Sequence, residues 1–298
     1  MTPDVQTFFD KATSTATHLV IDPATKTAAV VDPVLDFEPK AARLSTATAD
    51  AVLAAVRDQD LTLAYVLETH AHADHLSAAD YIRRETGAAV VIGAQITQVQ
   101  KTFIPVFEAD DADAQGRAFD RLIAEGDELP LGELTIRALH TPGHTPACVT
   151  YLIGDAAFVG DTLFMPDYGT ARADFPGGDT ATLYRSIRKI MALPAETRVF
   201  VGHDYLPAGR SDFAWETTVA RQRAANVHVH DGVGEAEFVA MRGQRDAILA
   251  APTLILPSLQ VNIRAGALPP ASPAGNVFLR LPVTIGRLGR QAATAEQT

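Results

Sequence analysis

The sequence is poor in cysteine, in long apolar runs and in clustered basic residues. Cys148 is its one cysteine, so no disulfide can form within the chain. No apolar run approaches the length needed to cross a bilayer, and the first residues lack the basic-then-apolar pattern of a signal peptide. Lys and Arg total 25 against 36 Asp and Glu, without a basic run. We therefore expect a soluble, cytoplasmic protein with no membrane or nucleic-acid partner.

What the chain does have is a dense group of potential metal ligands. They are His70, His72, Asp74 and His75. The group follows an apolar run of β-type composition, 63–67, and precedes a helix-like segment, 78–85. Loops at the carboxyl ends of strands commonly carry the chemistry of α/β proteins, and imidazole and carboxylate groups bind zinc and iron well. The alternative is a solvated histidine-rich turn, and the position at a strand end argues against it.

Apolar periodicity predicts the order of elements along the rest of the chain. The predicted strands are 18–21, 28–31, 63–67, 88–92, 133–139, 149–153, 156–159 and 198–201. The predicted helices are 49–57, 78–85, 183–191, 215–225 and 235–249. Residues 97–121 interrupt this order, and we interpret them as an excursion from the core, either a flap or oligomer contact or a solvated loop. Prolines recur between residues 252 and 273, and we read this stretch as irregular. We expect His228 and His230 to lie at the surface.

Three further candidate ligands each follow an apolar β-type run. His144 lies in Pro-Gly-His-Thr, Asp161 in Gly-Asp-Thr and His203 in Gly-His-Asp. Each motif alone is a weak signal, because such sequences commonly form turns and caps. Since strand ends converge on one edge of a sheet, residues far apart in sequence can meet there. Together with the first group, they predict a metal site.

This series of motifs resembles the metallo-β-lactamase superfamily over roughly residues 15 to 205. The resemblance implies a four-layer αββα sandwich, with the metal between the edges of two sheets. We assign 1–207 to this domain, 208–288 to a C-terminal helical and irregular extension packed on the same domain, and 289–298 to a flexible tail. His75 argues against a true β-lactamase, because those enzymes usually lack this second histidine. The fold alone does not fix the reaction.

A closer resemblance is to the persulfide dioxygenases, the ethylmalonic-encephalopathy protein group. It rests on Thr-His-Ala-His-Ala-Asp-His from Thr69, Pro-Gly-His-Thr-Pro-Ala-Cys-Val-Thr-Tyr from Pro142, Gly-Thr-Ala-Arg-Ala-Asp-Phe from Gly169, and Leu-Pro-Ser-Leu-Gln-Val-Asn-Ile-Arg-Ala-Gly from Leu256. The insertion after Thr97 and the long loop from Asp161 to Arg172 depart from animal and plant members and are similar to a bacterial subgroup.

The resemblance implies oxidation of glutathione persulfide by O2 to sulfite and glutathione at one Fe(II) per subunit. It makes His70, His144 and Asp161 the iron ligands and the catalytic residues. Two imidazoles and one carboxylate on one face of the iron leave adjacent positions open. The other four candidates would surround this centre and hydrogen-bond bound water and oxygen. They are His72, Asp74, His75 and His203.

Two other functions use the same residues. In a glyoxalase II-like hydrolase, one metal is held by His70, His72 and His144. A second metal is held by Asp74, His75 and His203, with Asp161 bridging. Two Zn(II) or mixed metals would then activate water to attack a glutathione thioester. The third function is a non-enzymatic metal sensor or assembly module, against which the complete ligand set argues.

Three residues are candidates for binding the substrate. Arg172 could hold a glutathione carboxylate by bidentate hydrogen bonds, or could instead pair with Asp174. Tyr205 could reach the thiol-bearing part of the substrate, or could be a half-buried core tyrosine. Arg264 comes from the late motif that resembles the dioxygenases. We assign no catalytic role to Cys148, which we expect to be buried. The resemblance implies a homodimer.

Overall fold

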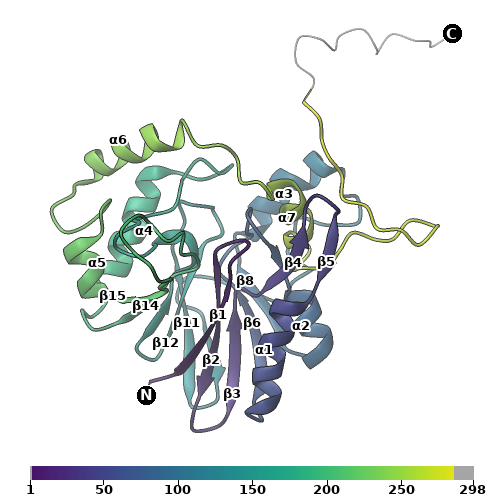
Figure 1. Cartoon of the computed structure of the whole chain (residues 1–298), viewed down its shortest axis with the longest axis horizontal. Coiled ribbons are helices and arrows are strands. Elements are labelled where there is room, and N and C mark those ends of the chain that lie inside the picture. The colour runs from purple at the N-terminus through teal and green to yellow at the C-terminus, as the bar shows by residue number, and fades with distance from the viewer. Residues whose placement is uncertain (1, 285–298) are drawn as a thin grey trace.

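Two six-stranded sheets lie face to face in the computed structural model, which describes residues 2–284 of the chain (Figure 1). The first sheet has the order β1-β2-β3-β6-β8-β9 and the second β10-β11-β12-β13-β14-β15. Their strands are β1 Asp4–Asp10, β2 Thr15–Asp22, β3 Thr27–Val31, β6 Thr62–Glu68, β8 Ala89–Gly93, β9 Arg121–Ile123, β10 Glu128–Leu131, β11 Leu134–His140, β12 Val149–Ile153, β13 Ala156–Phe158, β14 Arg198–Phe200 and β15 Glu216–Thr218. A small third sheet joins β5 Arg43–Ser45, β4 Val34–Glu38 and β7 Leu76–Ser77.

Helices cover the outer face of each sheet and complete four layers (Figure 1). The helices are α1 Ala47–Asp58, α2 Ala79–Thr86, α3 Ile96–Phe107, α4 Thr180–Met191, α5 Val219–Ala225, α6 Glu235–Asp246 and α7 Ile255–Asn262. The first three and α7 pack on the first sheet, and α4, α5 and α6 on the second. Buried side chains such as Val31, Leu67, Ile136 and Tyr151 fill the space between the sheets. This is the predicted αββα sandwich.

Strand ends bring the candidate ligands to one edge of the sandwich. In the first sheet, β6 pairs in parallel with both β3 and β8, and its carboxyl end leads into the loop with His70. In the second sheet, β13 pairs in parallel with β14, so Asp161 and His203 leave adjacent strands at the same end. Among the described helices, none has both the length and the apolar character that a membrane crossing requires.

The prediction of an excursion at 97–121 is wrong over its first part. Residues 96–107 form α3, which buries Val99, Phe103 and Phe107 in the core of the first sheet. Pro105 lies in the last turn of this helix. A proline there removes the N–H that would bond the Lys101 carbonyl, and the helix ends two residues later, at Phe107.

The C-terminal part also differs from the prediction in two places. The predicted helix 215–225 divides into strand β15 and helix α5, with Thr218 capping the helix through Arg221 N. The proline-punctuated stretch contains α7, in which Pro257 occupies the first turn, where no intrahelical N–H partner is required. Phe238 of α6 and Leu259 of α7 are fully buried in the two outer cores. Residues 285–288 and the expected tail at 289–298 lie outside the described residues.

Candidate metal centre

Asp32, at the end of β3, fixes the turn that starts the histidine loop. Its carboxylate accepts hydrogen bonds from Thr69 N and Thr69 Oγ1, both at 2.7 Å. Since the Thr69 hydroxyl donates to Asp32, its oxygen accepts from His70 Nδ1 at 3.0 Å. The lone pair of His70 Nε2 is therefore left free to bind a metal ion. Burial, reinforced by the neighbouring histidines, lowers the pKa of His70 well below its usual value, so the ring is neutral.

His72 faces the opposite way and is held by two buried carboxylates. Its Nε2 lies 3.0 Å from Asp32 Oδ1 and 3.1 Å from Glu68 Oε2 and donates to them, which leaves Nδ1 free. Burial opposes protonation of His72, but the two carboxylates outweigh it and raise its pKa. A carboxylate behind a histidine fixes the ring and makes it a stronger ligand. Asp32 and Glu68 were not recognised in the sequence, although each directly follows a predicted strand.

His144 comes from the loop between β11 and β12. Its Nδ1 donates to Arg172 O at 2.8 Å, so Nε2 faces Asp161, with Oδ2 at 3.8 Å. The preceding Gly143 has φ +134°, and a Cβ there would lie 2.3 Å from the Leu183 backbone at the start of α4. Glycine is thus required for the loop to pass the helix.

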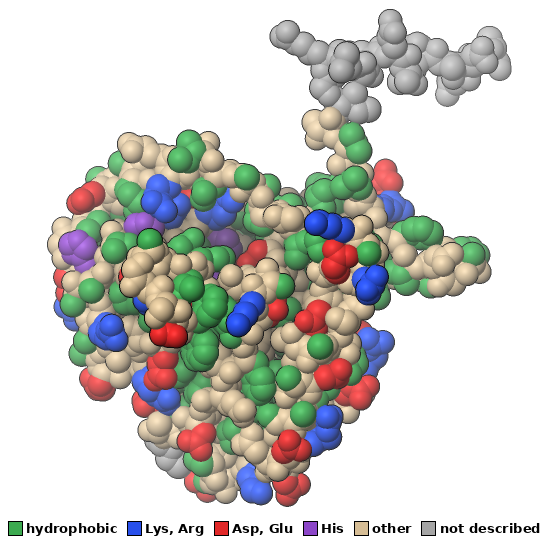
Figure 2. All heavy atoms as spheres, viewed as in Figure 1, with side chains coloured by type: hydrophobic (Ala, Val, Ile, Leu, Met, Phe, Trp, Pro, Cys, Tyr) green, Lys and Arg blue, Asp and Glu red, His purple; other side chains and the backbone are tan. Residues whose placement is uncertain are grey.

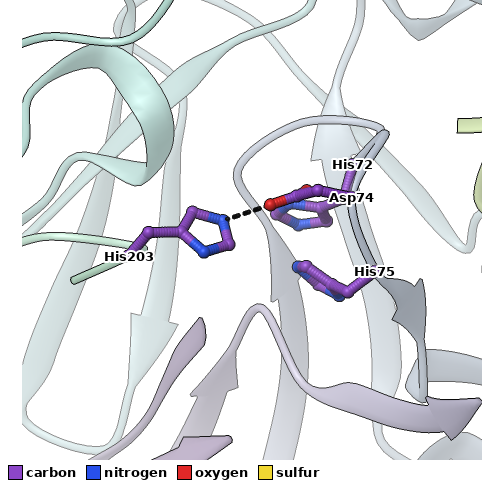
Figure 3. Close-up of side chains that lie close together, drawn as sticks. All are labelled: His72, Asp74, His75 and His203. Atoms are coloured by element: carbon purple, nitrogen blue, oxygen red, sulfur yellow. Dashed lines mark ion pairs between the residues drawn. The ribbon is translucent and has the colours of Figure 1, made fainter. Parts of the chain in front are cut away.

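Asp161 and His203 meet where β13 and β14 end. Asp161 lies in the short 3-10 turn Gly160–Thr162, and burial raises the pKa of its carboxyl group. His203 Nδ1 donates to Ser14 O at 3.2 Å, which directs Nε2 toward the other ligands. This Nε2 lies 3.2 Å from Asp74 Oδ2 and 3.3 Å from Asp161 Oδ1. Figure 3 shows His203 facing Asp74, with His72 and His75 beside them.

The seven candidates form two groups that we call the first and second ligand sets. The first ligand set is His70, His144 and Asp161, and the second is His72, Asp74, His75 and His203. Within each set, one donor atom per residue lies within 4.8 Å of all the others. All seven predicted metal-site residues are therefore brought together.

A metal fits the donor atoms that these sets present. Each of the five histidines donates one ring N–H to the protein. Five buried donor atoms at the centre make no hydrogen bond of their own, a costly arrangement unless something binds them. They are His70 Nε2, His72 Nδ1, His75 Nε2, His203 Nε2 and Asp161 Oδ1. Imidazole nitrogens with one or more carboxylates suit zinc or iron.

A cavity of about 560 Å³ opens onto this centre. His144, Asp161 and Asp74 line its floor, and Phe164, Tyr168 and Tyr205 contribute aromatic walls. The volume is in the range typical of small-molecule sites, roughly 300–1,000 Å³. The centre can thus be reached by a small substrate.

Comparison with known proteins agrees with this geometry. Residues 13–203 match the model of the Metallo-beta-lactamase superfamily. The chain belongs to the metallo-β-lactamase superfamily. Within it, the chain is similar to the Probable metallo-hydrolase BURPS1710b_2304 of Burkholderia pseudomallei, with 50% identity over 94% of this chain and 98% of that one. The chain is also 49% identical to a Beta-lactamase hydrolase-like protein of Xylella fastidiosa. This match covers 95% of the chain but only 65% of the length of that relative.

Other superfamily relatives carry different functional names. Glyoxylase B2 of Dictyostelium discoideum is 43% identical over 94% of this chain and 96% of its own length. The human mitochondrial Persulfide dioxygenase ETHE1 is 28% identical, with 89% of each chain covered. The crystal structure of ETHE1 from Myxococcus xanthus has a TM-score of 0.70 and 32% identity, covering 89% of this chain and all of that one.

The three predicted substrate-binding residues lie in different places. Tyr205 lines the cavity, is 38% exposed and stacks on His203 with 5.6 Å between ring centroids. Arg172 also lines the cavity, but its guanidinium is held by Asp174 and by Ala250 O. Arg264 lies away from it, beside a separate hollow, where it pairs with Asp111 at 2.6 Å. Cys148 is buried, and burial raises the pKa of its thiol to about 12.

The sequence did not indicate the positions of two further residues near the site. Asn262 of α7 donates to both His72 O and His75 O at 2.8 Å and accepts from Ser77 N at 2.8 Å. It thereby anchors the histidine loop from the far end of the chain. His228, expected at the surface, lines the cavity and receives a hydrogen bond from Thr170 N, whereas His230 is exposed as expected.

Proposed function

We propose that the protein is a persulfide dioxygenase that oxidises glutathione persulfide at a single Fe(II) held by the first ligand set. The observation that carries the proposal is the pairing of two imidazoles and one carboxylate beside the cavity. This donor set is typical of non-haem Fe(II) oxygenases. The likeness to ETHE1 of Myxococcus xanthus and to human Persulfide dioxygenase ETHE1 supports it.

The proposed reaction consumes glutathione persulfide, one O2 and one water and yields glutathione and sulfurous acid, which ionises to sulfite. The outer sulfur is oxidised, O2 is reduced, and the S–S bond breaks. His70, His144 and Asp161 would hold the Fe(II), which would supply the redox chemistry that couples the persulfide sulfur to O2.

The residues around the centre have separate tasks in this proposal. Arg172 O orients His144, and Thr69 orients His70, so that both rings keep a lone pair toward the centre. Asp74 reaches the cavity and lies beside His203 Nε2, a position suited to holding the water that the reaction consumes. The aromatic walls place ring surface beside the centre.

A second candidate is hydrolysis of a glutathione thioester by two metals. The second ligand set favours it, because His72, His75 and His203 each present a buried nitrogen without a partner. The name Glyoxylase B2 of the Dictyostelium relative points the same way. Two metals would lower the pKa of a shared water.

The two reactions are separated by oxygen consumption. Iron-loaded protein is given glutathione persulfide in an oxygen electrode, and sulfite is assayed in the same samples. The proposal predicts one sulfite for each O2 consumed. The thioester hydrolase instead predicts no oxygen uptake and rapid cleavage of S-D-lactoylglutathione by the zinc-loaded protein.

A further inference from the structure

His72 lies between the two ligand sets. Its ring centroid is 4.1 Å from that of His70 in the first set and 4.1 Å from that of His75 in the second. One of its ring nitrogens nevertheless groups with the donor atoms of the second set, on the side seen in Figure 3. Since distance alone favours neither set, the orientation of the ring decides which metal position His72 can serve.

Two carboxylates fix that orientation from the Nε2 side of the ring. His72 Nε2 lies 3.0 Å from Asp32 Oδ1 and 3.1 Å from Glu68 Oε2. Asp32 Oδ1 is shared, because it also accepts from Thr69 N at 2.7 Å. Within residues 2–284, Glu68 Oε2 accepts a hydrogen bond from His72 alone. A ring held only by the shared oxygen can pivot about it, and Glu68 supplies the second point of contact that prevents this.

Glu68 is itself held in place from behind. Ser77 Oγ donates to Glu68 Oε1 and accepts from Ala79 N at 3.0 Å. Ser77 N in turn donates to Asn262 Oδ1 of α7 at 2.8 Å. Because its two oxygens contact different groups, the Glu68 carboxylate cannot follow a turning ring. It therefore transmits the fixed position of Ser77 to His72.

The burial of Glu68 also calls for an explanation. Figure 2 shows Asp and Glu side chains interspersed with Lys and Arg at the visible surface, where water solvates them. Glu68 is instead only 2% exposed, and burying a carboxylate is unfavourable. The N–H of His72 already has an acceptor in Asp32, so Glu68 is not needed to satisfy it. Fixing the direction of the ring is the task that its contacts allow.

We propose that Glu68 is a positioning residue that reserves His72 for the second ligand set and so keeps the first set at three protein ligands. The proposal rests on the proposed function for the value of a three-ligand centre. In the two-metal arrangement, His72 instead joins His70 and His144 on one metal. A fourth protein ligand would close one of the positions that the first set leaves open for the persulfide sulfur and O2.

The test counts the histidines that bind the metal. Protein loaded with one Co(II) per chain is studied by proton NMR without persulfide or oxygen. Ring N–H protons of Co(II)-bound histidines are shifted far outside the ordinary range and disappear after exchange into D2O. The native chain should give two such signals, from the ring N–H groups of His70 and His144 that donate to Thr69 Oγ1 and Arg172 O.

Two variants separate the reach of Glu68 from its charge. Glu68→Asp keeps the charge but withdraws the oxygens by one methylene group, so the ring of His72 is released and a third signal should appear. Glu68→Gln keeps the reach. The Ser77 hydroxyl can accept from the new amide, which leaves the amide oxygen for His72, so two signals should remain. Oxygen uptake should fall by about 10–100-fold in Glu68→Asp only.

Asp22→Ala is the matched control, because Asp22 is also a buried carboxylate with hydrogen bonds, one of them from Glu133 N at 2.7 Å. It lies at the opposite end of β2 from Thr15, which pairs with His203. This variant should keep two signals. Two signals in Glu68→Asp, or three in the native chain, would overturn the proposal. Because the count is made without persulfide or oxygen, absent oxygen uptake would refute the proposed reaction and leave the count unaffected.

Discussion

The two ligand sets share one centre but are held by different chemistry. In the first, the ring N–H groups of His70 and His144 go to a hydroxyl and a backbone carbonyl. In the second, His72 is backed by the carboxylates of Asp32 and Glu68, and His203 lies beside Asp74. His144 and Asp161 of the first set border the cavity. The two histidines of the first set are thus backed by neutral acceptors, whereas carboxylates lie against His72 and His203 of the second.

Removing a member of the first set should have the largest effect. His144→Ala or Asp161→Ala should abolish iron binding and lower turnover by at least about 10³-fold, because a bound metal contributes several kcal/mol to such reactions. Iron content per chain and oxygen uptake are measured together. His230→Ala, at an exposed histidine outside both sets, is the control. Full iron content with full activity in either variant would refute the ligand assignment.

Removing a member of the second ligand set should lower iron content and turnover less. His203→Ala should keep one iron per chain and lower activity by about 10–100-fold, as is typical for residues that orient a metal centre from outside. The measurement is metal content by elemental analysis beside oxygen uptake. If the variant instead loses all iron and all activity, the two sets are not separable in function.

The smallest effect is expected where the C-terminal extension supports the second set. Asn262→Leu leaves His72 O, His75 O and Ser77 N without their partner, and should lower the free energy of unfolding by about 2–4 kcal/mol. Denaturant unfolding measures the loss. Asn276→Leu, at an exposed position, should change it by less than about 0.5 kcal/mol. Equal stabilities of the two variants would show that Asn262 does not anchor the loop.

The clustering of the candidate ligands could be predicted from sequence because the loops that carry them follow strands. His70, His144 and Asp161 come at the ends of β6, β11 and β13 or soon after, so local apolar runs located them. The four-layer αββα fold was predicted from the same motifs, through their resemblance to the metallo-β-lactamase superfamily. Such signals are local, and a single sequence contains them.

The missing parts depend on contacts between distant segments. Asp32 was not recognised as a partner of the site, because its contact with His72 joins residues 40 positions apart in sequence. α3 and α7 were missed because Pro105 and Pro257 indicate breaks, although both prolines lie near helix ends. His228 reaches the cavity only through its contact with Thr170, 58 residues away in sequence. No local pattern encodes these approaches.

The central claim is that one iron, in the first ligand set, carries out the oxidation. The most direct measurement titrates Fe(II) into metal-free protein and follows oxygen uptake with glutathione persulfide at each step. We predict that the rate rises linearly and reaches its plateau at one iron per chain. A plateau only at two irons per chain, or no oxygen uptake at any loading, would contradict the claim.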